Sequence, residues 1–169
     1  MKIIEPCTLT IFGAGGNLSR RKLIPALFRL EVAKRLPEQV AILGCDITPR
    51  SREEWLGIIT EIIKPLCPDG VDSAALARFC DRWHYFAIPP GDEVAYSRLQ
   101  VLLEEGGNFL PNVVYYMAVR PADYPAIIEK LGSIGLLKQK SGWRRVVIEK
   151  PFGYDLLSAQ TLQIGRAHV

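Results

Sequence analysis

Short apolar runs alternate along the chain with longer stretches in which apolar residues recur every three or four positions. The short runs predict buried strands, and the longer stretches predict amphipathic helices. Strands are expected at Thr8 to Phe12, Val40 to Cys45, Trp83 to Ile88, Val113 to Ala118 and Arg145 to Ile148. Helices are expected at about Leu18 to Lys34, Arg52 to Ile63, Ser73 to Phe79, Glu93 to Glu105, Pro125 to Leu131 and Leu156 to Leu162. This alternation predicts an α/β doubly wound fold, a mainly parallel sheet with helices on both faces.

Pro25 lies inside the first expected helix, where proline removes a backbone hydrogen bond and clashes with the preceding turn. We therefore expect a kink, with a short turn from Asn17 to Lys22 and a longer helix that restarts near Ile24. Asn17 is expected to cap the first turn, because its side-chain oxygen can accept from N–H groups two or three residues on.

A glycine turn and a basic helix start follow the first strand, in the run Gly13-Ala14-Gly15-Gly16-Asn17-Leu18-Ser19-Arg20-Arg21-Lys22. Glycines allow the backbone to approach a phosphate, and a helix start supplies unpaired N–H groups and the positive end of its dipole. The strict dinucleotide fingerprint is incomplete, because Leu18 stands where its third glycine is expected, and no Walker Gly-Lys-Ser/Thr is present. A tight strand-to-helix connection would account for the glycines equally well. Three cations at the positive end of a helix favour an anionic ligand.

In a Rossmann-like sheet, ligands bind beside the carboxyl ends of the strands, so the loops there are the next candidates. After the second strand, Asp46 suits ribose hydroxyls and so favours NAD, whereas Arg50 and Arg52 suit the 2′-phosphate of NADP. After the fifth strand, Lys150 precedes Pro151, whose ring constrains the backbone, so its ammonium is a candidate for gripping a phosphate or a sugar hydroxyl. Ordinary solvated loop residues remain the alternative for each of these cations and for Asp46.

Composition narrows the classes of function. The chain has 169 residues, 49% hydrophobic and 23% charged, which is ordinary for one globular domain. A net charge of +3, without aromatics interleaved among the basic residues, argues against a nucleic-acid partner. No apolar run reaches the ~20 residues of a membrane helix. Because Met1 to Pro6 is too short and too quickly broken for a signal peptide, a cytoplasmic protein is expected.

The four cysteines, Cys7, Cys45, Cys67 and Cys80, show no C-x-x-C spacing and no companion histidines. We expect reduced thiols in the core rather than a zinc site or a disulfide framework, and no metal ligands.

Three segments of the chain carry a resemblance to a known family. In chain order they are Gly13 to Leu23, Tyr116-Met117-Ala118-Val119-Arg120-Pro121 and Ile148-Glu149-Lys150-Pro151-Phe152-Gly153. Together they closely resemble the amino-terminal domain of the glucose-6-phosphate dehydrogenase family, and the resemblance extends to about Gln163. It implies oxidation of glucose 6-phosphate, or a similar anionic sugar, to a lactone in the pentose phosphate pathway, with hydride transfer to NADP or NAD.

The resemblance also implies roles for individual residues. Gly13 through Arg20 would wrap the cofactor pyrophosphate, Lys22 would lie beside the sugar, and Lys150 would contact substrate and cofactor together. Tyr124 falls where the family places a tyrosine near the nicotinamide, although a buried aromatic at a helix start would explain it as well. The full-length protein is expected to be a homo-oligomer.

Two departures from the family pattern concern the cofactor. NADP-preferring members usually carry an arginine at the position of Ile47, which here follows Asp46, so NAD use or dual use is expected. Asn17 replaces the usual aspartate, a mild change because both residues cap helices well.

No catalytic base is identified in this chain. His84 lies in an expected strand and His168 lies in the last six residues, whereas a hydroxyl oxidation needs a well-placed general base. In the family the base comes later, beyond an Asp-His-Tyr-Leu-Gly-Lys signature that is absent here. We therefore expect the fragment to bind cofactor weakly and to turn over nothing.

The last six residues, Ile164 to Val169, break the amphipathic helix that begins near Asp155, and the same six residues arise when a common sequencing adapter is translated. We expect residues 1–163 to be an incomplete NAD(P)-binding domain and 164–169 to be a non-native tail. Two alternative functions remain open: an NAD-linked dehydrogenase of another hexose substituted at carbon six, and a non-catalytic nucleotide-binding sensor.

Overall fold

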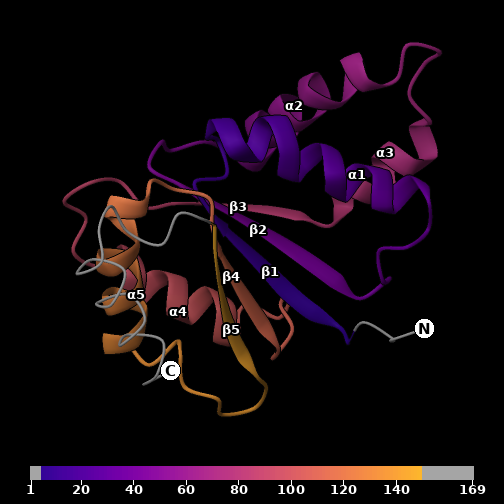
Figure 1. Ribbon diagram of the computed structural model, residues 1–169. Coiled ribbons are helices and arrows are strands. Elements are labelled where there is room, and N and C mark those ends of the chain that lie inside the picture. The colour runs from indigo at the N-terminus through magenta and orange to yellow at the C-terminus, as the bar shows by residue number, and fades with distance from the viewer. Residues whose placement is uncertain (1–4, 150–169) are drawn as a thin grey trace.

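The computed structural model describes residues 5–149, in which five parallel strands form one sheet of order β3-β2-β1-β4-β5 (Figure 1). The strands are β1 (Cys7–Phe12), β2 (Val40–Asp46), β3 (Trp83–Ala87), β4 (Val113–Met117) and β5 (Arg144–Ile148). Every neighbouring pair is parallel. The chain builds one half of the sheet outward from β1 and the other half outward from β4. This reversal between β1 and β4 confirms the doubly wound, Rossmann-like prediction.

Helices cover both faces of this sheet. They are α1 (Ile24–Val32), α2 (Arg52–Ile63), α3 (Ser73–Asp81), α4 (Ala95–Glu105) and α5 (Tyr124–Ser133), with short turns η1 (Ser19–Leu23), η2 (Lys64–Leu66) and η3 (Pro121–Asp123). In Figure 1, α1, α2 and α3 lie above the sheet, and α4 and α5 lie below it. Neighbouring residues of β2 show the consequence, because Ile42 belongs to the core on the α1 side and Leu43 to the core on the α4 side. Burial on both faces explains why the strands are nearly continuous apolar runs.

The predicted restart of the helix near Ile24 agrees with the structure. A π-helical turn, η1, carries the chain to α1, which begins at Ile24 and has Pro25 in its first turn. Leu23 and Ile24 both have helical backbone angles, so the helical run continues through Pro25, and the wider π-helical turn lies where the proline lacks an N–H to donate one turn back.

The predicted side-chain cap at Asn17 is wrong. The helical run begins at Asn17 itself, and the residue before η1, Leu18, has helical backbone angles and no capping side chain. The hydroxyl of Ser19 holds this end instead, by donating to the carbonyl oxygen of Gly13 at 2.9 Å. This bond ties the helix start to the glycine turn but satisfies none of the free N–H groups that a cap would bind.

Other expected elements agree closely with the structure. Helix α2 has its predicted bounds because Ser51 and Glu54 form a capping box at its start.

Among residues 5–149, no helix is long and apolar enough to cross a membrane, and no cluster of potential ligands could hold a metal ion. The helix expected at Leu156 to Leu162 lies outside the described residues, as do Lys150 and the last six residues.

Candidate cofactor site

A crevice of about 820 Å³ opens at the carboxyl ends of β1 to β4, where the strand order reverses. This is the place at which open α/β sheets bind their ligands. Its walls come from four loops and from α4 and α5: Phe12, Gly13, Gly16, Asn17, Leu18, Cys45, Asp46, Ile47, Ile88, Pro90, Tyr96, Ala118, Val119, Arg120, Asp123 and Ile127. Five residues predicted to bind cofactor therefore share one cavity.

Gly13 packs the turn between the ends of β2 and β4. Its φ of 80° lies in the left-handed region, which favours glycine. The N–H groups of Gly13 and Ala14 both donate to the carbonyl of Cys45, at 2.9 and 3.1 Å. A Cβ on Gly13 would lie only 2.5 Å from the carbonyl oxygen of Ala118. Close packing between strand ends, as well as any approach to phosphate, thus requires glycine here.

Asp46 is tied directly to the glycine turn. Its Oδ2 accepts from the N–H of Gly15 at 2.6 Å, and its Oδ1 accepts from the N–H of Ile47 at 2.7 Å. A Cβ on Gly15 would come within 2.2 Å of Oδ2, so this contact requires glycine. A carboxylate has about four acceptor positions, and each Asp46 oxygen therefore retains capacity for a ribose hydroxyl.

The helix start forms the floor beside Asp46. Gly16 donates to the carbonyl of Gly13 at 3.0 Å, which closes the turn, and the helical run then begins at Asn17. The first N–H groups of a helix have no carbonyl one turn earlier. Because Asn17 and Leu18 line the crevice, this end of the helix fits an anionic group such as a pyrophosphate.

Arg120 adds the positive charge that an anionic cofactor needs. Its Nε and Nη2 donate to the two carboxylate oxygens of Asp123 at 3.0 and 3.3 Å, and both residues line the crevice. Among the described residues that line the crevice, Arg120 carries the sole cationic side chain, against Asp46 and Asp123. Arg120 was not among the residues expected to bind cofactor, although it belongs to the segment from Tyr116 to Pro121 that carries the family resemblance.

Arg20 and Arg50 lie in a second groove, whose lining also includes the carboxylates of Glu54 and Glu61. They line this cavity of about 740 Å³ together with Thr48 and Pro49. Arg20 donates from Nε to the carbonyl of Gly15 at 2.8 Å, and Arg50 donates from Nη1 to the hydroxyl of Tyr85 at 2.9 Å. Both arginines thus flank the turn without entering the first crevice.

Arg52 is directed elsewhere. Its Nε donates to the carbonyl of Trp83 at 3.1 Å and its Nη2 to that of Cys80 at 3.2 Å. These bonds tie the start of α2 to the link between α3 and β3. Arg52 therefore has a structural role here, instead of the 2′-phosphate binding expected from the sequence.

The remaining predicted site residues are dispersed. Ala14 is fully buried in the core, where only its backbone is polar, and Tyr124 is buried at the first position of α5. Lys22 is exposed on η1 and does not line the crevice. Lys150 lies outside the described residues. The structure therefore groups Gly13, Gly16, Asn17, Leu18 and Asp46, and it places the other described candidates around them.

His84 is part of the packing of β3. Its ring meets Phe109 edge-on with centroids 4.9 Å apart, and burial together with the nearby Arg52 lowers its pKa. It does not line the crevice. This placement agrees with the structural role expected for it.

A family model described as glucose-6-phosphate dehydrogenase, NAD binding domain, matches residues 10–167. The chain belongs to the glucose-6-phosphate dehydrogenase family. The crevice thus lies in the part of this family that is described as binding the nicotinamide cofactor.

Relatives within the glucose-6-phosphate dehydrogenase family match nearly the whole chain. The glucose-6-phosphate 1-dehydrogenase of Aggregatibacter actinomycetemcomitans is 36% identical over 95% of this chain and 33% of its own length. That of Treponema pallidum (strain Nichols) is 38% identical over 98% of this chain and 33% of its own. The chain therefore spans about a third of the length of the curated relatives it matches.

Solved glucose-6-phosphate dehydrogenase structures share the fold described above. The crystal structure of the Mycobacterium avium glucose-6-phosphate 1-dehydrogenase gives a TM-score of 0.81 at 30% identity, covering 98% of this chain and 34% of that one. A glucose-6-phosphate dehydrogenase in complex with its substrate glucose 6-phosphate gives 0.78 at 31% identity, covering 97% and 34%.

Proposed function

We propose that the full-length protein oxidises glucose 6-phosphate to 6-phosphoglucono-lactone, and that this domain supplies its nicotinamide-cofactor site. The support is membership of the family together with a crevice that unites the glycine turn, a helix start and Asp46. Bound nicotinamide supplies the hydride acceptor for the anomeric carbon. The turn from Gly13 to Arg20 holds the pyrophosphate, and Lys22 and Lys150 hold the sugar side.

We further propose that the base that takes the hydroxyl proton lies in the remainder of the full-length protein. His84 packs against Phe109 and is outside the crevice lining, and burial favours its neutral form without placing it near a substrate. A general base must come within hydrogen-bond reach of the proton it removes. Cytoplasmic location and homo-oligomeric assembly stay predictions.

Cofactor choice rests on Asp46, and we propose a preference for NAD. Its carboxylate is held by two backbone N–H groups at the wall of the crevice, where it can accept from ribose hydroxyls. A 2′-phosphate at the same place would meet a fixed negative charge. The next residue, Ile47, is 59% exposed and provides no compensating cation.

The decisive experiment is steady-state kinetics of the full-length protein with both cofactors. We expect a higher kcat/KM with NAD than with NADP, and Asp46→Ala should shift the ratio toward NADP. An unchanged ratio in that variant would show that Asp46 does not face the ribose. A wild-type preference for NADP would refute the NAD assignment.

The substrate is tested by comparing glucose 6-phosphate with glucose and with a hexose sulfonated at carbon six. Preference for either of the latter would overturn the proposed substrate and favour another hexose dehydrogenase. Cofactor binding without turnover of any sugar would favour a nucleotide-binding sensor instead.

A further inference from the structure

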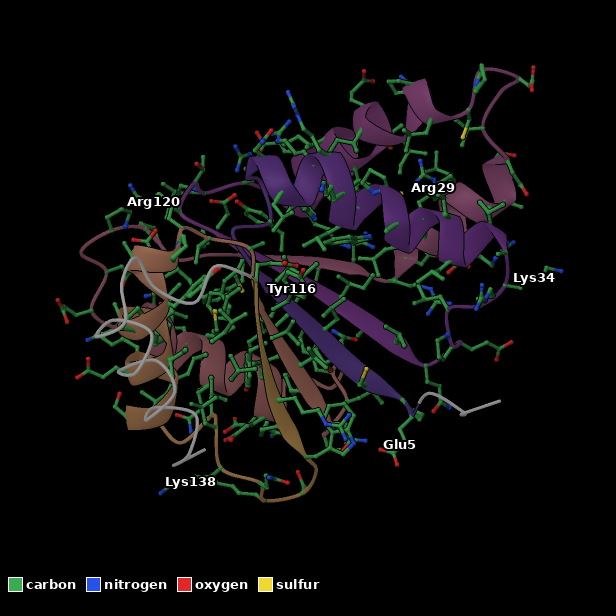
Figure 2. All side chains as sticks on the ribbon, viewed as in Figure 1. Glu5, Arg29, Lys34, Tyr116, Arg120 and Lys138 are labelled. Atoms are coloured by element: carbon green, nitrogen blue, oxygen red, sulfur yellow. The ribbon has the colours of Figure 1, made fainter. Side chains whose placement is uncertain are left out.

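Tyr116 and Glu149 are joined by a hydrogen bond between the ends of two strands. The Tyr116 hydroxyl on β4 donates to Oε1 of Glu149, the residue that directly follows β5. The register pairs Tyr116 with Val147 and Met117 with Ile148. Glu149 thus lies one position beyond the last backbone pair, and Figure 2 shows Tyr116 toward this end of the sheet.

Adjacent tyrosines on β4 face opposite sides of the sheet. Tyr115 belongs to the core on the α4 side, where its buried hydroxyl donates to the carbonyl of Leu136 at 3.0 Å. Tyr116 packs against the core on the α1 side, and its hydroxyl reaches the partly open end of β5. Tyr115 therefore serves the packing of the domain, whereas Tyr116 serves the segment that leaves the sheet.

The carboxyl end of β5 lies at an edge of the described sheet. In the described sheet β5 has a neighbour on one side only, and the preceding Val147 is 38% exposed. Burial and the Glu149 carboxylate both raise the pKa of Tyr116, so the phenol remains a donor at neutral pH. A neutral donor that faces a carboxylate makes a stronger hydrogen bond than two neutral groups do.

We propose that Tyr116 is a positioning residue, which holds Glu149 and thereby fixes the start of the peptide that leads to Lys150. The proposal rests on the role proposed above for Lys150 at the sugar. The hydrogen bond ends at the side-chain carboxylate of Glu149, the residue that directly precedes Lys150 in the sequence. Because a displacement of about 1 Å at a reacting centre can cost ~100-fold in rate, a restraint at this position affects catalysis.

The test compares two single-atom deletions in the full-length protein, Tyr116→Phe and the matched control Tyr115→Phe. Tyr116→Phe should lower kcat/KM for glucose 6-phosphate by roughly 10-fold or more, while the thermal midpoint stays close to wild type. The reason is that Glu149 is exposed and water can replace the phenol. Tyr115→Phe should lower the thermal midpoint and leave kcat/KM close to wild type, since it leaves the buried carbonyl of Leu136 without its donor.

Variants at Glu149 test whether Tyr116 acts through this carboxylate. Glu149→Gln keeps an acceptor and should retain most of the activity, whereas Glu149→Ala should match Tyr116→Phe. The double variant Tyr116→Phe/Glu149→Ala should lose little beyond either single one, because both remove the same hydrogen bond. Wild-type kinetics in Tyr116→Phe, or fully additive losses, would overturn the proposal.

A second measurement does not depend on turnover. The rate at which an amine-reactive reagent modifies Lys150, followed by peptide mass spectrometry, should change in Tyr116→Phe and not in Tyr115→Phe. If the wild-type protein oxidises no sugar phosphate, the proposed function fails, and this labelling still decides the positioning role. Equal labelling rates in all three proteins would refute it.

Discussion

Gly15→Ala is the substitution that most directly probes the link between the glycine turn and cofactor choice. Its added Cβ would lie 2.2 Å from Oδ2 of Asp46, which forces the carboxylate away from the turn. The obstacle is the end of a side chain rather than backbone, so Asp46 can rotate and the fold can persist. This substitution therefore displaces Asp46 without deleting its charge.

The expected magnitude follows from the contact that is lost. The bond from the Gly15 N–H to Asp46 spans 2.6 Å and has a charged acceptor, and such bonds contribute about 1.5–3 kcal/mol. This bond lies within the protein, so its loss acts by moving Asp46. A ribose hydroxyl on the same carboxylate would also make a charge-assisted bond of about 1.5–3 kcal/mol, and its loss should lower kcat/KM with NAD by ~10-fold to 100-fold, since each 1.4 kcal/mol is a factor of about ten. The value with NADP should fall less, because the repelling carboxylate has moved.

The assay is kcat/KM with each cofactor for wild type, Gly15→Ala, Asp46→Ala and the double variant of the full-length protein. Both single variants should narrow the NAD/NADP ratio, and the double variant should resemble Asp46→Ala. Gly132→Ala is the control, because a Cβ there meets only Leu137 at 3.8 Å. An unchanged ratio in Gly15→Ala, with the protein folded, would refute the idea that the turn positions Asp46 for the ribose.

Three further predictions concern charge. Arg120→Gln should weaken dinucleotide binding by roughly 10-fold at low salt, the effect expected from losing one exposed charge-assisted contact, and by less at high salt. Equal affinities of wild type and variant in a fluorescence titration would contradict this prediction. Arg82→Met should destabilise the fold by about 3 kcal/mol in urea unfolding, because it lies 2.7 Å from the buried carboxylate of Glu31. Arg78→Met should cost less, since that arginine is 49% exposed, and equal losses would be inconsistent with this ranking. The pKa of His84 in the folded protein lies below its usual 6.5, so as pH falls His84 is protonated in the unfolded chain before it is protonated in the folded one. Stability should therefore decrease as pH drops through about 6.5, with a smaller decrease in His84→Asn; identical profiles would argue against this source.

Much of the fold could be predicted from the sequence, because its signals are local. A strand buried on both faces requires a nearly continuous apolar run, and all five expected strands are found within one residue of their predicted ends. Pro25 predicted where α1 begins, because proline lacks the N–H that a regular helix needs, and the π-helical turn before it accommodates this gap. The predicted cap at Asn17 was wrong because Asn17 is itself part of the helical run, a one-residue difference in the helix start that periodicity does not decide.

The candidate site was only partly predictable. Its glycine turn and Asp46 were identified as neighbours of strand ends, but the bond between Gly15 and Asp46 joins residues 31 positions apart and exists because β2 lies beside β1. Tyr116 and Glu149 are 33 positions apart and meet only through the pairing of β4 with β5. The sequence made Arg52 a candidate for binding the 2′-phosphate, whereas in the structure it donates to the carbonyls of Trp83 and Cys80.

The sequence by itself thus determined the elements, the glycine turn and the family, since these depend on residues close together along the chain. The tertiary structure alone decided the strand order, the bond of Asp46 to the glycine turn, the bond of Arg52 to a backbone carbonyl, and the position of Arg120 in the crevice lining. The physical reason is that side-chain periodicity is set by local backbone geometry. Which donor meets which acceptor is set by strands brought together from distant parts of the chain.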